Sequence, residues 1–246
     1  MRKASKGDRL SVRLRAIADL VTDGMRVADV GCDHGFLSVE LVSSGKCPRA
    51  LAMDVRTGPL SRAEEHIREA GLSDRIETRL GNGLGAMRPE EADSVVIAGM
   101  GGPLMEQIIS DSISTCRSMK ELILQPQSEI PHFRQYLLEN GFSVIEERMV
   151  KDGGKIYVMI KAVPCTENRN GGSVTEWSRM EIAFGKDLLG RKDPVLREYL
   201  LREKRIRENI LRDLCGINTV HALQRAAETE EELQIIGEGL KIYEGL

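Results

Sequence analysis

One stretch of the chain, residues 26–54, constrains the fold most because it places a glycine-rich turn between an apolar run and a helical pattern. The run Val27–Val30 has the length of a buried β-strand, and it leads into the small and polar residues Gly31–Gly35. The helical pattern that follows stops at Gly45, a residue suited to a left-handed helix C-cap. Strand, turn, helix and second strand predict a right-handed βαβ unit, which binds ligands at the carboxyl ends of its strands.

Two acidic residues indicate which ligand such a unit would bind. Asp54 ends the second apolar run, Ala50–Met53, where a carboxylate suits the hydroxyls of a ribose. The turn reads D-x-G-x-D-x-G, so Asp33 stands where the dinucleotide fingerprint G-x-G-x-x-G has its middle glycine. A carboxylate there repels a pyrophosphate and attracts a cation, which favours S-adenosylmethionine over NAD. The alternative is a strand-to-helix turn that binds no ligand.

Three more strands are predicted downstream, and each runs into small or polar residues. Residues 75–80 lead into Gly81-Asn82-Gly83, residues 94–98 into Gly99–Pro103, and residues 121–124 into Gln125-Pro126. Because open α/β sheets bind ligands at this end of their strands, the turns are expected to form one site. Residues 142–150 and 156–160 flank a tight D-G-G turn and predict an antiparallel hairpin. Parallel strands closed by such a hairpin are typical of Rossmann-like methyltransferases.

A helix is also expected after Asp54. It carries His66, which we expect at the surface.

The composition describes a globular protein without an extreme of charge. The chain has 246 residues, of which 41% are hydrophobic and 30% charged, and its formal net charge is −3. This charge argues against nucleic-acid binding through bulk positive charge but leaves room for a local basic patch. No run reaches membrane-spanning length, and residues 1–6 lack the apolar core of a signal peptide, so we expect a cytoplasmic protein.

The cysteines and histidines do not predict a metal site. The cysteines are five, scattered and never in C-x-x-C spacing, which also argues against a disulfide scaffold. The four histidines are equally dispersed, and H-E-x-x-H is absent. We therefore expect no metal. A monomer is our working expectation, although no motif determines the oligomeric state.

The last third of the chain differs in character from the rest. Residues 164–173 are polar and glycine-rich and predict a linker between a domain of residues 1–163 and one of residues 174–246. Residues 194–214 and 220–243 have helical periodicity around a short break and predict a helical hairpin. Its basic residues suggest RNA contact, but three acid-first pairs four residues apart favour a self-paired surface. The pairs are Glu198–Arg202, Glu203–Arg207 and Glu208–Arg212.

Several motifs together resemble one known family. V-A-D-V-G-C-D-H-G, R-L-G-N-G, I-A-G-M-G-G and L-I-L-Q-P, with the opening L-S-V-R-L, are similar to those of bacterial tRNA (adenine-N1)-methyltransferases of the TrmK type. The similarity covers residues 10–163, and the helical C-terminus resembles that family's coiled-coil domain. It implies an S-adenosylmethionine-dependent enzyme that methylates adenine-22 of tRNA.

With this resemblance, positions in the motifs suggest roles. Adenine N1 attacks the methyl group with its own lone pair, so Asp33 is our candidate for stabilising the charge that develops on the ring. His34 beside it is a candidate for orienting the base or accepting a proton. The alternatives are that Asp33 binds the cofactor's ammonium group or caps the next helix, and that His34 makes a structural hydrogen bond.

The remaining candidates lie at the strand ends, except for Arg13, which lies on a helix. The candidate cofactor-binding residues are Gly31, Asp33, Gly35, Asp54, Asn82, Gly83, Gly99 and Met100. The candidate tRNA-binding residues are Arg13, as a phosphate contact on a basic helix of residues 9–21, and Gly101 and Gly102, as the floor of the base pocket. Two other functions stay open: a methyltransferase for a protein or small molecule, and a non-catalytic cofactor- or RNA-binding module.

Overall fold

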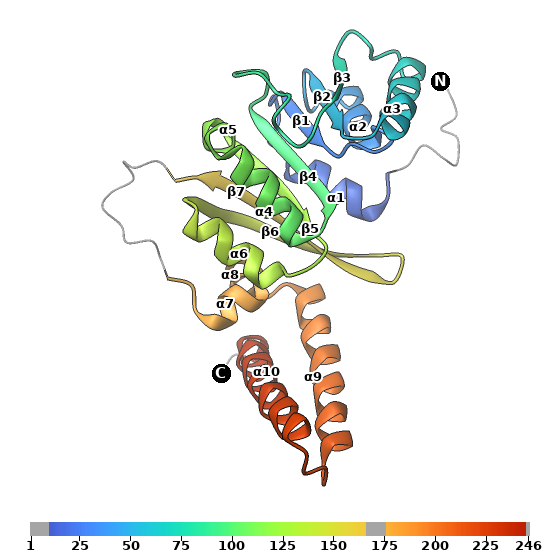
Figure 1. Cartoon of the computed structure of the whole chain (residues 1–246). Coiled ribbons are helices and arrows are strands. Elements are labelled where there is room, and N and C mark those ends of the chain that lie inside the picture. Colours follow the sequence, from blue (N-terminus) through green and yellow to red (C-terminus); the bar gives the residue numbers. More distant parts are fainter. Residues whose placement is uncertain (1–9, 166–175, 245–246) are drawn as a thin grey trace. The chain divides into compact units, whose positions relative to one another are not determined.

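The computed structural model describes residues 10–165 and 176–244 and divides them into two compact units (Figure 1). Residues 10–165 form the first unit and residues 176–244 the second. Each unit is described by itself. Within these residues, no helix is both long and apolar enough to cross a lipid bilayer.

A seven-stranded sheet is the centre of the first unit. Its strands lie in the order β3-β2-β1-β4-β5-β7-β6. The bounds of the strands are β1 Val27–Val30, β2 Ala50–Asp54, β3 Ile76–Leu80, β4 Ser94–Met100, β5 Glu121–Pro126, β6 Phe142–Asp152 and β7 Lys155–Pro164. Strands β1 to β5 pair in parallel, and β7 pairs antiparallel with both β5 and β6. The predicted parallel sheet closed by a hairpin is thereby confirmed.

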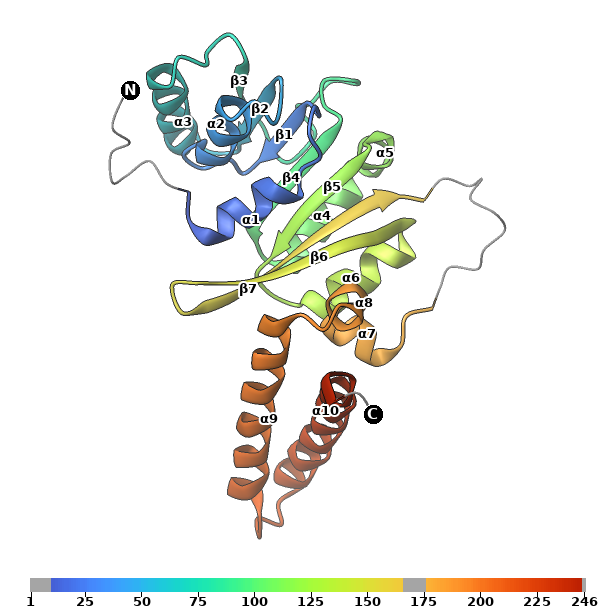
Figure 2. The same ribbon diagram turned by 180° about the vertical axis from the view of Figure 1, so that it is seen from behind.

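Helices cover both faces of this sheet. Helices α1 (Val12–Leu20), α2 (Phe36–Ser43) and α3 (Thr57–Glu69) lie on one face. Helices α4 (Gly102–Asp111), α5 (Ile113–Ser118) and α6 (Ile130–Glu139) lie on the other, as the two opposite views show (Figure 1, Figure 2). The central strands β1, β2 and β5 are buried at every position, as a sheet covered on both faces requires. Helices α4 and α5, between β4 and β5, were not predicted from the sequence.

The strand order determines where the first unit can hold a ligand. The chain passes from β1 outward through β2 to β3, and then returns to place β4 on the other side of β1. At this reversal the connections after β1 and β4 leave in opposite directions, which opens a crevice at the carboxyl ends of the strands. The register aligns Val30 of β1 with Met53 of β2 and Ile97 of β4. The glycine-rich turns that follow these strands therefore come together.

Helix α1 begins later than the sequence suggested. Its predicted range started at Arg9, which lies outside the described residues. The observed helix starts at Val12, because the Ser11 hydroxyl accepts a hydrogen bond from the Leu14 backbone N–H and caps it. Four residues of α1, namely Ala16, Ile17, Ala18 and Leu20, are buried against the rest of the unit. The helix is thus part of the folded domain.

The second unit contains the predicted helical hairpin. Its helices are α7 (Arg179–Phe184), α8 (Lys186–Gly190), α9 (Pro194–Leu214) and α10 (Val220–Glu244). Asp193 caps α9 by accepting hydrogen bonds from two backbone N–H groups of the first turn. The Tyr243 hydroxyl donates to the Asp193 carbonyl at 2.9 Å and so ties the end of α10 to the start of α9.

One of the three predicted ion pairs on α9 also joins the two helices. Arg207 pairs with Glu203 of its own helix, as the spacing predicted, and its Nε donates to Glu232 of α10 at 2.9 Å. Arg212 instead donates to Asn209 at 3.2 Å. The acid-first spacing therefore identified Glu203–Arg207 correctly but did not reveal its link to the neighbouring helix.

Candidate active site

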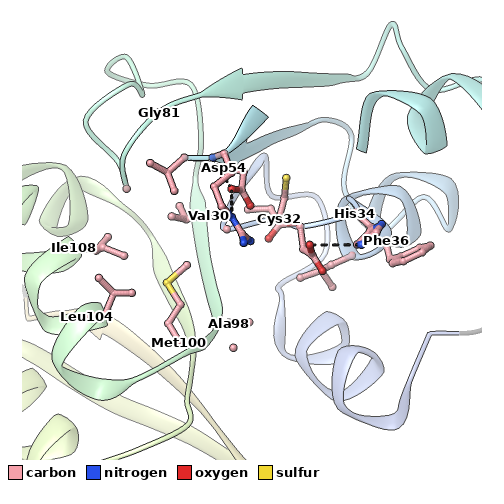
Figure 3. Close-up of a pocket in the computed structure, with 18 of the residues that line it drawn as sticks. Val30, Cys32, His34, Phe36, Asp54, Gly81, Ala98, Met100, Leu104 and Ile108 are labelled. Carbon is pink, nitrogen blue, oxygen red and sulfur yellow. Dashed lines mark hydrogen bonds and ion pairs between the residues drawn. The ribbon is translucent and has the colours of Figure 1, made fainter. Parts of the chain in front are cut away.

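A cavity of about 530 Å³ lies at the carboxyl ends of β1 to β4 (Figure 3). This volume is in the range of sites for nucleotide-sized ligands. Nine of the predicted site residues line the cavity: Arg13, Gly31, Asp33, His34, Asp54, Asn82, Gly83, Gly99 and Met100. These residues come from five separate places in the sequence. The fold brings them together, as expected for turns at the carboxyl ends of parallel strands.

The turn after β1 has an unusual backbone conformation. Gly31, Asp33 and Gly35 all have left-handed φ angles, of 75°, 51° and 71°. The Gly31 and Cys32 N–H groups donate to the Met53 carbonyl at 2.8 and 2.9 Å, which folds the turn over the end of β2. A Cβ atom on Gly31 would lie 2.3 Å from the Met100 methyl group. The Met100 methyl is the flexible end of its side chain and could move aside, so the left-handed φ of 75° is what favours glycine at position 31.

Three carboxylates line the cavity. Two are buried: Asp29 is 4% exposed and Asp54 is 5% exposed. The third is Asp33, whose side chain is 64% exposed. Asp33 and Asp54 were predicted from the sequence, whereas Asp29 was assigned only to a strand. Its place at the start of the D-x-G-x-D-x-G pattern was the signal that was missed.

The two buried carboxylates have different hydrogen-bond partners. Asp29 accepts a hydrogen bond from the Ser38 hydroxyl at 2.7 Å, yet burial raises the pKa of Asp29 to about 6, and the charge of nearby Asp54 adds to this increase. Asp54 accepts a hydrogen bond from the Arg56 backbone N–H at 2.9 Å. Its carboxylate is thus held at the end of β2, where it faces the cavity (Figure 3).

Asp33 and His34 lie beside each other at the cavity wall. The Asp33 carboxylate lies 3.7 Å from Nε2 of His34, the contact drawn as a dashed line in Figure 3. Asp33 does not cap α2, because Gly35 is the N-cap residue and no side chain bonds to the helix end. This rules out the helix-capping alternative. His34 Nε2 also lies 3.5 Å from a guanidinium nitrogen of Arg62, which can only donate, so Nε2 accepts at that contact.

The turn after β3 forms another part of the wall. Asn82 is exposed to the cavity, and Gly83 has a left-handed φ of 57°. The Arg79 guanidinium donates to the Ala86 carbonyl at 2.9 Å and to Glu91 at 2.6 Å, so it holds the loop that contains Asn82 against the end of β3.

Arg13 is part of the cavity wall and not a free surface cation. Its guanidinium donates to the Gln125 side-chain oxygen at 2.9 Å and lies 5.6 Å from the centre of the Tyr157 ring. Its backbone N–H donates to Asp152, in the hairpin of β6 and β7, at 3.0 Å. Gln127, which was not among the predicted site residues, also lines this part of the cavity.

Three predicted site residues do not line the cavity: Gly35, Gly101 and Gly102. A Cβ on Gly35 would lie 3.0 Å from the Ala63 Cβ of α3, and one on Gly102 would lie 2.7 Å from the Ser128 carbonyl oxygen. A Cβ on Gly101 would lie 3.0 Å from the Ser128 hydroxyl. These glycines allow close packing of helices and loops, which is a different requirement from room for a ligand. Among the described residues, no three His, Cys, Asp or Glu side chains are grouped to hold a metal ion.

Residues 10–160 match a family described as "Methyltransferase domain". The sheet, the strand-end cavity and this match define a Rossmann-like methyltransferase domain. The chain is 33% identical over 154 residues to the tRNA (adenine(22)-N(1))-methyltransferase of Bacillus subtilis, a match that spans 63% of this chain and 65% of that protein. It is 30% identical to a putative tRNA methyltransferase of Mycoplasma pneumoniae, over 60% of this chain and 68% of that one.

Solved structures extend the similarity beyond the aligned sequence. The crystal structure of Streptococcus pneumoniae Sp1610, described as a putative tRNA (m1A22) methyltransferase, superposes with a TM-score of 0.84 and 29% identity. This superposition covers 94% of our chain and all of the other. The Bacillus subtilis TrmK structure superposes with a TM-score of 0.81 and 26% identity, over 94% of our chain and 99% of TrmK. The chain belongs to the TrmK family of bacterial tRNA methyltransferases.

Proposed function

We propose that the protein transfers a methyl group from S-adenosylmethionine to N1 of an adenine in tRNA, adenine-22 by its family relationship. The observation that carries this proposal is the set of three carboxylates, Asp29, Asp33 and Asp54, in one cavity at the sheet's reversal point. Three acids favour a cationic nucleoside over a dinucleotide with a pyrophosphate. Sp1610 has also been crystallised in complex with S-adenosyl-L-methionine, and that structure superposes on our chain with 28% identity.

The cavity residues fit this cofactor. Asp54 ends β2 with a carboxylate that can accept hydrogen bonds from two ribose hydroxyls. Asn82 and Gly83 are proposed to contact the adenine, and Gly31 exposes backbone toward the methionine portion. Gly99 and Met100 would border the sulfonium side of the cavity. When bound, S-adenosylmethionine supplies an electrophilic methyl group on a positively charged sulfur.

The residues at the cavity wall then have the chemistry that adenine N1 requires. N1 carries a lone pair, so no proton has to leave before it attacks, and positive charge develops on the adenine ring. The exposed Asp33 carboxylate is proposed to stabilise this charge. His34, 3.7 Å from Asp33, is proposed to orient the base or to accept a proton afterwards. Arg13, held by Gln125, is proposed to contact a phosphate near the target nucleotide.

Methylation of defined tRNA transcripts tests the function directly. The protein, labelled S-adenosylmethionine and unmodified bacterial tRNA should yield 1-methyladenosine, identified by nucleoside analysis. A matched transcript with guanine in place of adenine-22 should remain unlabelled. Labelling of both transcripts would contradict the assignment of the position, and the absence of labelled nucleoside from every tRNA would contradict the proposed activity.

Cofactor affinity should depend on pH because of Asp29. A cation in the cavity favours the ionised form of Asp29, whose pKa of about 6 in the free protein exceeds the ordinary carboxyl value. Free protein is therefore mostly protonated at Asp29 at pH 5 and mostly ionised at pH 7. Linkage then predicts about tenfold tighter binding of S-adenosylmethionine at pH 7 than at pH 5, measured by calorimetry.

Asp29→Asn provides the control for this pH dependence. The variant should bind with nearly the same affinity at both pH values, since the titrating group is gone. It should also raise the Tm of the ligand-free protein at pH 8, where the buried wild-type carboxylate is ionised at a cost in stability. Wild-type binding that does not change between pH 5 and pH 7 would show that Asp29 is not coupled to the ligand.

The second unit is proposed to contribute to tRNA binding, with a domain boundary in residues 164–173. Residues 166–173 lie outside the described residues, whereas β7 ends at Pro164, which pairs with Phe142. A truncation after Cys165 keeps this pair. It should retain cofactor affinity within about twofold and lose at least about tenfold in tRNA affinity, measured by filter binding at fixed salt. Equal tRNA affinity in both proteins would give the helical hairpin a structural role only.

A further inference from the structure

His66 of α3 makes a direct contact with the turn that carries Asp33 and His34. Its Nδ1 lies 2.8 Å from the His34 backbone carbonyl oxygen. A carbonyl oxygen can only accept a hydrogen bond, so Nδ1 carries the hydrogen and donates. His66 was expected at the surface, but in the structure it is half-buried against the turn and against Phe36 of α2. The contact joins residues 32 positions apart in the chain.

The turn that receives this hydrogen bond has backbone conformations that need support. Asp33 has a φ of 51°, which costs free energy for a residue other than glycine. Within the turn, the Gly35 N–H donates to the Cys32 carbonyl at 2.8 Å, and no side chain caps the helix that follows. The bond from His66 comes from a neighbouring helix and reaches the carbonyl of His34, the residue between Asp33 and Gly35.

The imidazole ring of His66 also packs against the side chains that follow the turn. Its centre lies 4.7 Å from that of the Phe36 ring and 5.9 Å from that of the His34 ring. His34 and Phe36 are themselves 5.7 Å apart and nearly parallel, with 16° between their planes. The three rings therefore form one cluster, in which His34 and Phe36 line the cavity and His66 does not.

We infer that His66 is a positioning residue for methyl transfer, which holds the Asp33–His34 turn in its reactive geometry through the Nδ1–carbonyl hydrogen bond. The inference rests on the proposed function, since it assigns a role in the chemistry at Asp33 and His34. His66 acts through these residues and is not itself placed at the substrate. Because a small displacement of a reacting group lowers the rate far more than it lowers binding, the loss should fall on turnover.

Three substitutions separate the hydrogen bond from the ring. His66→Ala removes both, and His66→Phe keeps an aromatic ring without the donor. His66→Asn keeps a donor near the position of Nδ1 without the ring. Glu65→Ala is the matched control, since Glu65 is the adjacent residue of the same helix and its side chain is 59% exposed. The measurements are the single-turnover rate of tRNA methylation, the Kd for S-adenosylmethionine and the Tm, all on the full chain.

We expect about tenfold slower single turnover for His66→Ala and His66→Phe. The Kd of these two variants for S-adenosylmethionine should stay within about threefold of wild type. The single-turnover rates of His66→Asn and Glu65→Ala should also stay within about threefold of wild type. Wild-type activity on tRNA establishes the proposed function separately, so a failure of that function shows as an inactive wild type.

Two kinds of result would overturn the inference while the wild type is active. Turnover within about twofold of wild type in both Ala and Phe variants would remove His66 from positioning. Slow turnover in His66→Asn would assign the effect to packing of the ring and not to the hydrogen bond. The same conclusion would follow if the single-turnover rates of the three His66 variants changed in proportion to their Tm values, whether or not the variant keeps the hydrogen-bond donor.

Discussion

Asp33→Asn should slow single-turnover methylation of tRNA by a factor of about 10²–10³. The amide has the shape of the carboxylate but no charge, so it loses the stabilisation of positive charge that develops on the target adenine. Asparagine also tolerates the left-handed backbone at this position, where φ is 51°. The substitution therefore tests the charge without a strain that alanine would add.

Cofactor affinity distinguishes the two roles proposed for Asp33. If Asp33 acts on the adenine, the Kd for S-adenosylmethionine should change by less than about threefold while turnover falls. If it binds only the cofactor's ammonium group, the loss should appear mainly in Kd and be recovered at saturating cofactor. Asp74→Asn, at an exposed acid outside the cavity, is the matched control. Near-native turnover of Asp33→Asn would remove Asp33 from the chemistry.

Asp54→Ala should weaken binding of S-adenosylmethionine by at least about hundredfold. A buried carboxylate that accepts two ribose hydroxyls makes two charge-assisted hydrogen bonds, each worth about 1.5–3 kcal/mol. Calorimetry on the full chain at pH 7 measures the change. Asp54 is only 5% exposed, so water cannot easily take the place of the missing carboxylate and bind the ribose hydroxyls.

Asp54 has a structural contact that the experiment must separate from binding. Its carboxylate accepts the Arg56 N–H at 2.9 Å, a bond that Asp54→Asn can keep through the amide oxygen. The Asn variant should therefore keep a Tm no lower than that of wild type. Its affinity should fall about tenfold, less than in the Ala variant, because one acceptor oxygen remains for the ribose. Asp23→Ala, at an exposed acid that pairs with Lys46, should leave affinity unchanged. Equal affinity in Asp54→Ala and wild type would disprove the ribose assignment.

Much of the fold could be predicted because its signals are local. The apolar runs of β1, β2, β4 and β5 are long enough for buried strands, and the D-G-G turn at residues 152–154 predicted the hairpin of β6 and β7. Helix α9 was predicted at its observed bounds, Pro194–Leu214, because a proline starts its periodic pattern and a break ends it. The gathering of Asp33, Asp54 and Asn82 followed from one general rule, since parallel strands end at the same edge of a sheet.

The sequence by itself thus determined which segments form the strands, which turns follow them, and that Asp33 and Asp54 lie in or next to these turns. These features depend on periodicity and turn chemistry, which are set by neighbouring residues. Only the tertiary structure decided which distant side chains meet. Arg13 bonds to Gln125 across 112 positions, His66 bonds to the His34 carbonyl, and Asp29 acquires a raised pKa. It also showed that Gly35 and Gly102 serve close packing. The physical reason is that such contacts depend on strand register and on how helices pack across the sheet, which no local pattern specifies.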